Sequence, residues 1–255
     1  MIVSDVALPI VALAQSRTLA EQAQSAMLDP LAGSSWSTPA TVEGFTRSLP
    51  NDTLLRLAAV ERARVPGGRV LDIGCGAGRN AVPLAHQGWR VVGTDLSWPM
   101  LLAAAGRRAS DRETGRLSLA VAPMDRLPVR DRAIDLIVAH GIWNLARSAA
   151  EFRRAIGEAS RVAAPRAALF VFTFSRSTLP ADAAPVPGEP FVFVQFSGQP
   201  QCFVTADQLV EELGAAGFAP DDTVPFTEHN LPAGGATHVA RPPVIFEAAF
   251  RFVGA

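Results

Sequence analysis

The sequence contains no lysine and no tyrosine, and these absences exclude several kinds of chemistry. All 23 basic residues are arginines, and the aromatic residues are phenylalanines and tryptophans. Without lysine, the chain forms no Schiff base and lacks the lysine of a phosphate-binding loop. Without tyrosine, no phenol acts as an acid or a base. Reactions that depend on a Tyr–Lys pair, as in short-chain reductases, are therefore excluded.

Cysteine is scarce as well, since Cys75 and Cys202 are the only two. Two cysteines make neither a disulfide framework nor a zinc site, so we expect no metal and a reducing, cytoplasmic setting. No run approaches about 18 apolar residues, so no membrane span is expected. Residues 7–14 end like a secretory cleavage site, but Asp5 and the lack of a preceding basic residue argue against a signal peptide.

Charged residues are only 18% of the chain, and the formal net charge is −1. This balance gives no electrostatic reason to expect nucleic acid or an anionic membrane as a partner. Hydrophobic residues make up 49% of the 255 positions. That is enough for one large α/β domain with additions.

One stretch, residues 69–97, organises the rest of the chain. It begins with a short apolar run that ends on Asp72. Three glycines follow at alternating positions, namely Gly74, Gly76 and Gly78. Apolar residues at three- and four-residue steps then predict a helix. Residues 90–94 form a predicted second strand, and Asp95 stands at its end.

A strand, a glycine turn, a helix and a second strand together indicate a site for a nucleotide-like ligand. Glycines permit positive φ and let a ligand lie against the backbone, and the start of the helix offers free N–H groups. Asp95 is placed to accept two hydrogen bonds from a ribose diol. The spacing is G-x-G-x-G and not the dinucleotide G-x-G-x-x-G. The negative charge of Asp72 suits an ammonium group better than a pyrophosphate.

These residues resemble motif I and the acidic strand end of class I S-adenosylmethionine-dependent methyltransferases. The resemblance implies that the glycine loop packs on the methionine part of S-adenosylmethionine and that Asp95 holds its ribose. It also implies that Asp125 accepts a hydrogen bond from the adenine amino group, with Met124 against the ring, although Asp125 also suits a simple turn. The predicted cofactor-binding residues are Asp72, Gly74, Cys75, Gly76, Gly78, Arg79, Asp95, Leu96, Met124, Asp125 and His140.

The resemblance covers residues 70–174 and implies a Rossmann-like, doubly wound α/β fold. We expect a mostly parallel seven-stranded sheet with one antiparallel strand. The further strands are predicted at residues 117–121, 134–139, 167–174, 221–227 and 244–252. The main helices are predicted at residues 53–64, capped by Asp52 or Thr53, and at residues 99–108, 148–162 and 205–216. A turn is expected at residues 163–166, where the family usually has Pro-Gly-Gly.

We expect additions at two places. Residues 1–52 form an N-terminal helical cap segment in this prediction, and residues 53–255 form the methyltransferase domain. An insertion at residues 175–204 contains a predicted β-hairpin. The alternative for residues 31–52 is a surface connector that contributes nothing to a site.

Methyl transfer from a sulfonium is an in-line displacement, so the chain mainly has to align the acceptor and exclude water. If the acceptor is an O–H or N–H group, a general base helps, and histidine is the usual choice. His140, at the end of the fourth strand, is the predicted base, with the alternative that only its backbone lines the cofactor. His86 is assigned a structural role, and His229 and His238 either reach the site or lie on the surface.

A small-molecule methyl acceptor is favoured by what the fourth strand lacks. Residues 139–142 read Ala-His-Gly-Ile, whereas amino-group methylases of DNA and protein amides have an Asn/Asp-Pro-Pro-aromatic motif there. Neither cysteine follows a proline, as the nucleophile of cytosine-C5 methylases does. The predicted acceptor-binding residues are Trp36, Trp143, Asn144 and Phe196. Two other classes stay open: a cofactor-binding domain without catalysis, and an NAD-dependent oxidoreductase.

Overall fold

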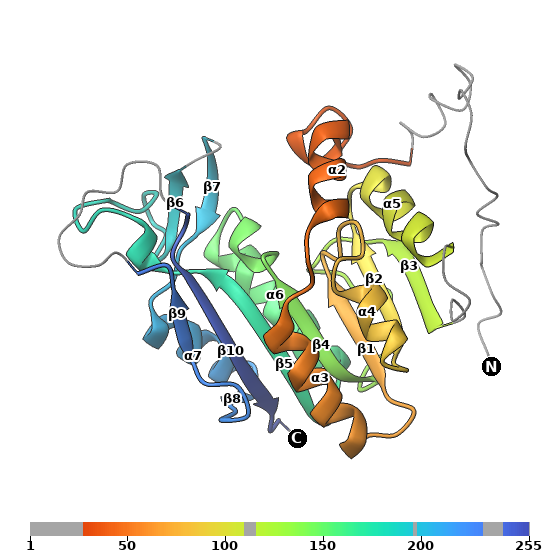
Figure 1. The fold of residues 1–255 in the computed structure, drawn as a ribbon. Helices are drawn as coiled ribbons and strands as arrows, with labels where there is room; N and C mark the ends of the chain where they lie inside the picture. The colour runs from red at the N-terminus through yellow and green to blue at the C-terminus, as the bar shows by residue number, and fades with distance from the viewer. Residues whose placement is uncertain (1–27, 110–115, 196–197, 232–241, 255) are drawn as a thin grey trace.

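The computed structural model describes residues 28–109, 116–195, 198–231 and 242–254. Eight strands form one sheet in the order β3-β2-β1-β4-β5-β10-β8, with β9 paired to β10 (Figure 1). Their bounds are β1 Arg69–Ile73, β2 Arg90–Asp95, β3 Leu117–Val121, β4 Ile134–His140, β5 Ala163–Phe174, β8 Phe218–Pro220, β9 Thr227–His229 and β10 Ile245–Phe252. The first five strands are parallel, and β10 is antiparallel to β5. The predicted mostly parallel sheet is confirmed, with one strand more than expected.

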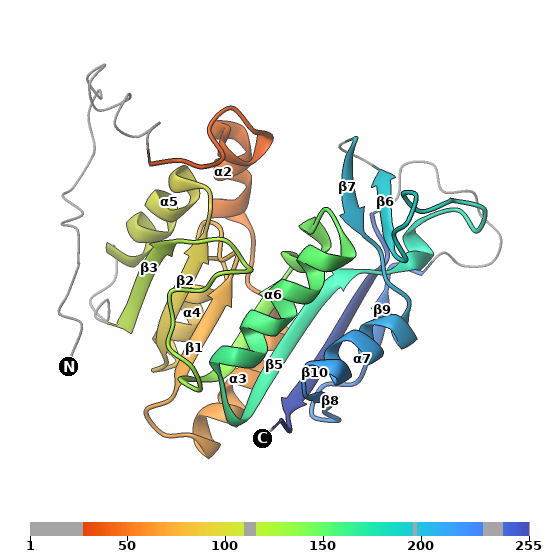
Figure 2. The same ribbon diagram turned by 180° about the vertical axis from the view of Figure 1, so that it is seen from behind.

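Helices cover both faces of the sheet. The bounds are α2 Pro39–Arg47, α3 Asp52–Arg64, α4 Ala81–His86, α5 Trp98–Ala109, α6 Ala149–Val162 and α7 Ala206–Ala215. Apolar residues of α3, α4 and α5 share a core with one face (Figure 1). The apolar stripes of α6 and α7 pack on the other face (Figure 2). Among the described residues, no helix has the length and apolarity that a membrane crossing requires.

Several boundaries differ from the predictions for local reasons. Helix α3 is capped by Asn51, whose side chain accepts a hydrogen bond from the Leu54 N–H, and not by Asp52 or Thr53. Strand β5 already begins at Ala163, and the expected turn is absorbed as an irregularity in its pairing with β4, with Arg166 at φ 62°. The strand predicted at residues 221–227 is wrong, since β8 ends at Pro220 and a turn follows.

Two additions lie beyond the carboxyl ends of the parallel strands. One is the segment that includes α2, which Thr38 caps and Pro39 begins. The other is the predicted hairpin, which is confirmed as β6 (Val192–Gln195) paired antiparallel with β7 (Gln199–Cys202). Both rise past the same edge of the sheet (Figure 1). Parallel sheets bind ligands at this edge, so both additions lie where a site is expected.

The opposite end of α3 is tied to the last long strand by charge. Glu61 is buried, and its carboxylate accepts hydrogen bonds from Arg251 at 2.7 and 2.9 Å and from the Arg64 Nε at 2.8 Å. Arg251 also donates to Asp221 at 2.8 Å. Burial alone would raise the pKa of Glu61, but the hydrogen bonds and charges of Arg251 and Arg64 lower it overall.

Candidate functional site

The glycine loop between β1 and α4 has the strained backbone that its sequence predicts. Gly74, Gly76 and Gly78 have φ of 67°, 52° and 76°, a region that side chains other than glycine rarely adopt. A Cβ on Gly74 would lie 2.6 Å from the Ile142 side chain. Glycine at this position therefore lets the loop after β4 pack directly on the glycine loop.

Asp95, at the end of β2, is fixed against the same loop. Its Oδ2 accepts a hydrogen bond from the Gly76 N–H at 2.9 Å, and its Oδ1 accepts one from the Ser97 N–H at 2.8 Å. Burial raises the pKa of Asp95 despite the hydrogen bonds that it accepts from the backbone. A carboxylate oxygen has more than one lone pair, so Asp95 can still accept bonds from a diol.

Asp72 is the most unusual residue of the site, because it is a buried acid with an unused oxygen. Its Oδ2 has no hydrogen-bond partner among the described residues. Burial raises the pKa of Asp72 to about 7, opposed by the charge of Arg79 and increased by that of Asp95. A buried oxygen without a partner marks a place that a ligand can complete. A cationic group there would also lower the cost of the buried negative charge.

Cys75 and Arg79 take part in different ways. The Cys75 thiol is buried against β2, where a Cβ on Gly93 would lie 2.8 Å from its Sγ. Burial raises the pKa of this thiol well above its ordinary value, so it is no nucleophile. Arg79 turns across the loop, and its Nη2 lies 2.8 Å from the Nδ1 of His140.

The residues predicted to hold the adenine have partners of their own. Asp125 accepts a hydrogen bond from the Arg154 Nε of α6 at 3.2 Å. Met124 is partly buried against the core on the α6 face, and Leu96 is partly exposed after β2. The assignment of these three residues to the cofactor stays a prediction.

The segment before α3 lies over the glycine loop. The Ser97 hydroxyl lies 3.0 Å from that of Ser37 and donates to the Trp36 carbonyl at 3.4 Å. Phe45 reaches down until its ring would lie 3.5 Å from a Cβ on Gly76, and Trp36 packs edge-on to it with ring centroids 6.0 Å apart. Residues 35–47 thus lie where a cap would, although Trp36 remains 38% exposed.

The predicted floor of the acceptor pocket is placed differently. Trp143 is fully buried in the core of the α6 face, with its ring edge-on to Phe152 at 6.3 Å, and Asn144 is buried beside it. Neither side chain lines an open surface in this structure, so for them the expected pocket floor is not observed. Their Nε1 and Oδ1 atoms lack partners among the described residues. Phe196 lies outside the described residues, as do His238 and residues 1–27.

A row of polar residues that the sequence analysis did not connect runs across the sheet from β4 to β9. His140 of β4 stacks on Phe172 of β5 at 4.1 Å, and Phe172 pairs in register with Glu247 of β10. The Asn51 Nδ2 donates to the Glu247 Oε2 at 2.7 Å and lies 3.5 Å from the His140 Nε2. The His229 Nε2 of β9 lies 3.4 Å from the other oxygen, Oε1, of Glu247.

His140 is not free to act as a base in this row. An arginine has only hydrogen-bond donors, so Arg79 occupies the lone pair of His140 Nδ1 and leaves the proton on Nε2. Burial, and then the charge of Arg79, lower the pKa of His140 to about 3. The catalytic role of His140 stays a prediction, and in this structure its imidazole is neutral and its Nδ1 is occupied by Arg79.

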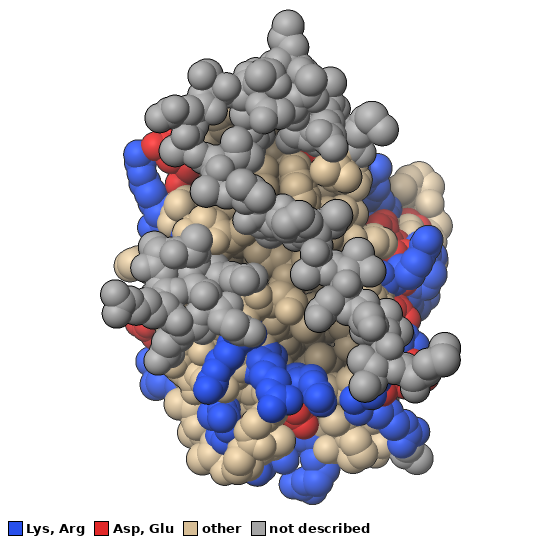
Figure 3. Space-filling model, turned by 90° about the vertical axis from the view of Figure 1, so that its right-hand side faces the viewer, with Lys and Arg blue, Asp and Glu red and all other residues tan. Residues whose placement is uncertain are grey.

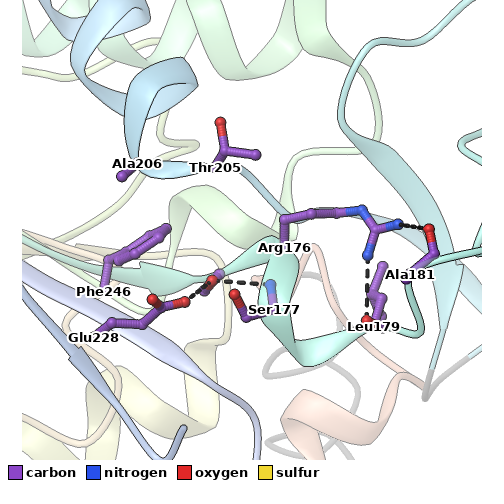
Figure 4. A pocket seen from close by; sticks show the side chains of 9 residues that line it. Arg176, Ser177, Leu179, Ala181, Thr205, Ala206, Glu228 and Phe246 are labelled. Carbon is purple, nitrogen blue, oxygen red and sulfur yellow. Dashed lines mark hydrogen bonds between the residues drawn. The ribbon is translucent and has the colours of Figure 1, made fainter.

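A cavity of about 560 Å³ opens on the other face, at the base of the hairpin (Figure 4). Glu228 of β9 accepts a hydrogen bond from the buried Ser175 hydroxyl at one wall. At another wall of the cavity, the Arg176 guanidinium donates hydrogen bonds to the carbonyls of Leu179 and Ala181 in its own loop. Phe193 is buried under the Arg176 guanidinium at 5.0 Å and does not line this cavity.

Basic and acidic side chains are mixed on the face that carries the β3 end of the sheet. Figure 3 shows the largest group of basic side chains on this face in its lower half, with acidic ones among them. Since the chain has no lysine, these basic side chains are arginines. They lie toward the end of the sheet that is opposite the glycine loop.

Comparison with known proteins shows a family match over the central segment. Residues 70–166 match the family described as methyltransferase domain. The chain is 37% identical over 133 residues to the ubiquinone/menaquinone biosynthesis C-methyltransferase UbiE of Syntrophotalea carbinolica. The aligned region covers 51% of this chain and 54% of that protein. The chain thus spans about half the length of the curated relatives that it matches first.

Solved structures share the fold over most of the chain. One is a Burkholderia thailandensis 1,6-didemethyltoxoflavin-N1-methyltransferase with bound 1,6-didemethyltoxoflavin and S-adenosylhomocysteine, with a TM-score of 0.57, 20% identity and 78% coverage of both chains. Another is the [4+2]-cyclase SpnF, with a TM-score of 0.53, 25% identity, and coverage of 72% of this chain and 62% of that one.

Proposed function

We propose that the chain, whose residues 70–166 match the methyltransferase-domain family, is a class I S-adenosylmethionine-dependent enzyme that transfers a methyl group from S-adenosylmethionine to a small-molecule acceptor. The observation that carries this proposal is Asp72, whose buried carboxylate oxygen has no partner beside the glycine loop. S-adenosylmethionine, when bound, supplies a methyl group on a sulfonium, and the acceptor displaces the thioether from the methyl carbon in line. Among its groups, the ammonium matches Asp72.

Other residues of the site are proposed to bind the remaining parts of the cofactor and to exclude water. Asp95, already fixed by the Gly76 and Ser97 N–H groups, would hold the ribose diol. The positive-φ glycines would let the methionine part lie against the backbone. Phe45 and Trp36 of the cap would exclude water from above. Met124 and Asp125 remain the proposed neighbours of the adenine, and Leu96 remains a proposed cofactor-binding residue.

The acceptor is proposed to be a small molecule because the names of the similar methyltransferases refer to small molecules. The UbiE relatives are named for ubiquinone and menaquinone biosynthesis, and the Burkholderia enzyme was solved with 1,6-didemethyltoxoflavin. The similar SpnF is named as a [4+2]-cyclase, so this fold does not fix the reaction. A turnover assay that detects S-adenosylhomocysteine, run with a panel of phenols, thiols and amines, separates methyl transfer from a reaction that transfers no methyl group. A protein that binds NAD and not S-adenosylmethionine in calorimetry would overturn the proposal.

Replacement of Asp95 tests the cofactor site directly. We expect Asp95→Ala to weaken S-adenosylhomocysteine binding by about 1.5–3 kcal/mol, because hydrogen bonds to a charged group are lost. Titration calorimetry measures this change, and circular dichroism checks that the variant is folded. An unchanged affinity in a folded variant would remove Asp95 from the site.

Replacement of Trp36 tests the cap against the connector. Because Trp36 is partly exposed and packs on Phe45 over the glycine loop, Trp36→Ala should lower turnover about tenfold while the melting temperature falls little. Melting temperature, cofactor affinity and turnover are measured on the same preparation. If all three stay the same, residues 31–52 are only a connector.

A further inference from the structure

His229 is the end of a hydrogen-bonded chain that begins at the glycine loop. The Asn80 Oδ1, at the end of that loop, accepts a hydrogen bond from the Asn51 N–H at 3.0 Å. The Asn51 Nδ2 donates to the Glu247 Oε2 at 2.7 Å, and the Glu247 Oε1 faces the His229 Nε2 at 3.4 Å. Asn80 is 4% exposed and Glu247 is 6% exposed. Residues from segments far apart in sequence thus form one line of contacts, and Glu247 is the member that contacts the imidazole.

The direction of these hydrogen bonds follows from their partners. The Asn51 Oδ1 accepts from the Leu54 N–H at 2.8 Å as the cap of α3, so the Asn51 amide has its nitrogen toward Glu247. Glu247 is then an acceptor on both oxygens, and its neighbour His229 donates from Nε2. In neutral His229 the lone pair is consequently on Nδ1, the atom that a general base uses.

Exposure separates the two members of the pair. The Glu247 side chain is 8% exposed, whereas the His229 side chain is 43% exposed. A buried carboxylate that orients a more exposed imidazole is the arrangement in which histidine acts as a base. Apo structures often show such hydrogen bonds longer than in the working complex, which fits the 3.4 Å separation. His140, in contrast, has its Nδ1 occupied by Arg79.

Aromatic rings lie beside this pair on the same face. Phe172 is the register partner of Glu247, and His140 is stacked on it at 4.1 Å. Phe174 and His229 are both register partners of Ile245, from the two neighbouring strands. Both phenylalanines are only partly buried, and one face of each ring is already stacked, Phe172 on His140 and Phe174 on Phe203 at 5.3 Å. Ring faces beside a base suit an acceptor that is itself aromatic.

We infer that His229, positioned by Glu247, is the general base for an acidic hydroxyl acceptor, a phenol. This inference rests on the proposed methyl transfer. The acceptor O–H proton passes to the His229 Nδ1, and the electron pair of the acceptor oxygen forms the new C–O bond to the methyl carbon. The C–S bond breaks and its electron pair returns to the sulfur, so the sulfonium becomes a thioether. His229 then releases the proton to solvent through its exposed side.

Two phenols of different acidity test the inference in turnover. One is electron-rich and protonated at the assay pH, and the other is electron-poor and already ionised. We expect His229→Ala to lower kcat for the protonated phenol by about 10²–10⁴-fold, the usual contribution of a general base, and to change the ionised phenol little. Glu247→Gln should show the same selectivity with a smaller loss. The control is His86→Ala, a histidine on α4 away from the carboxyl edge, which should match the wild type with both phenols.

A spectroscopic measurement needs no turnover. With S-adenosylhomocysteine bound, the wild type should bind a 4-nitrophenol as its coloured phenolate at a pH where the free phenol is protonated, and His229→Ala should bind it colourless. Equal losses with both phenols, or colour retained in His229→Ala, overturn the base. Wild-type turnover of thiols or amines but of no phenol overturns the inference and leaves the proposed function. No S-adenosylhomocysteine from any acceptor overturns both.

Discussion

Asp72→Asn should make the ligand-free protein more stable at pH 8 and should weaken its affinity for S-adenosylhomocysteine. The pKa of Asp72 is raised from 3.8 to about 7, with burial as the main cause. A group whose folded pKa is raised binds its proton more tightly in the folded state, so stability falls as the pH rises from about 4 to about 7. At pH 8 the raised pKa of Asp72 lowers the free energy of unfolding by roughly 4 kcal/mol, since one pKa unit is about 1.4 kcal/mol.

Asparagine removes the charge and leaves an amide with one unpaired group, which costs about 1–3 kcal/mol. Subtracting this cost from the roughly 4 kcal/mol gives an expected net gain in unfolding free energy of about 1–3 kcal/mol at pH 8. At pH 4 the charge penalty is nearly absent, so the variant should be less stable than the wild type by up to about 3 kcal/mol. Urea unfolding at several pH values measures it. A difference between variant and wild type that does not grow with pH would contradict the prediction.

The binding half of this prediction has a matched ligand control. If Asp72 faces the ammonium group, the variant should lose about 1.5–3 kcal/mol in affinity for S-adenosylhomocysteine. It should lose nothing for 5′-methylthioadenosine, which lacks the amino acid part. Titration calorimetry with both ligands measures the two affinities. Equal losses for both ligands would place Asp72 away from the ammonium group.

Strands β1 to β4 and the glycine loop were predictable because the sequence patterns that indicate them are local. Strand β3 has the predicted bounds, residues 117–121, and β1, β2 and β4 differ by one or two residues at their ends. Each is a short apolar run with turn residues on both sides. The glycine loop and Asp95 follow from spacing alone, because a β-α-β unit brings the loop and the second strand end together.

The polar row was not predictable, because it depends on strand register. Glu247 meets Asn51 only because β10 pairs antiparallel with β5 in one register and not in another. A shift of one residue would turn Glu247 to the opposite face. The burial of Trp143 was not predictable for a similar reason, since the sequence pattern locates it after β4 but does not say that its ring turns into the core.

Arg251→Ala should lower the free energy of unfolding by about 3–5 kcal/mol, because it leaves the buried Glu61 carboxylate without its main partner. The Glu61 side chain is 3% exposed, and Arg251 donates to both of its oxygens. Arg64 reaches the same carboxylate but is 37% exposed, so Arg64→Ala is the matched control and should cost only about 1 kcal/mol or less. Urea unfolding near neutral pH measures both variants.

The pH dependence distinguishes a charge effect from lost packing. The folded pKa of Glu61 lies below its ordinary 4.5, so its contribution to stability is fully present above that pH and is lost as the pH falls through the folded pKa. In Arg251→Ala most of this contribution is already missing, because only Arg64 still donates to Glu61. The deficit of the variant should therefore narrow below about pH 4.5, where the wild type loses the ion pair. A deficit of constant size from pH 7 to pH 3 would mean that Arg251 stabilises β10 through its apolar stem and not through its charge.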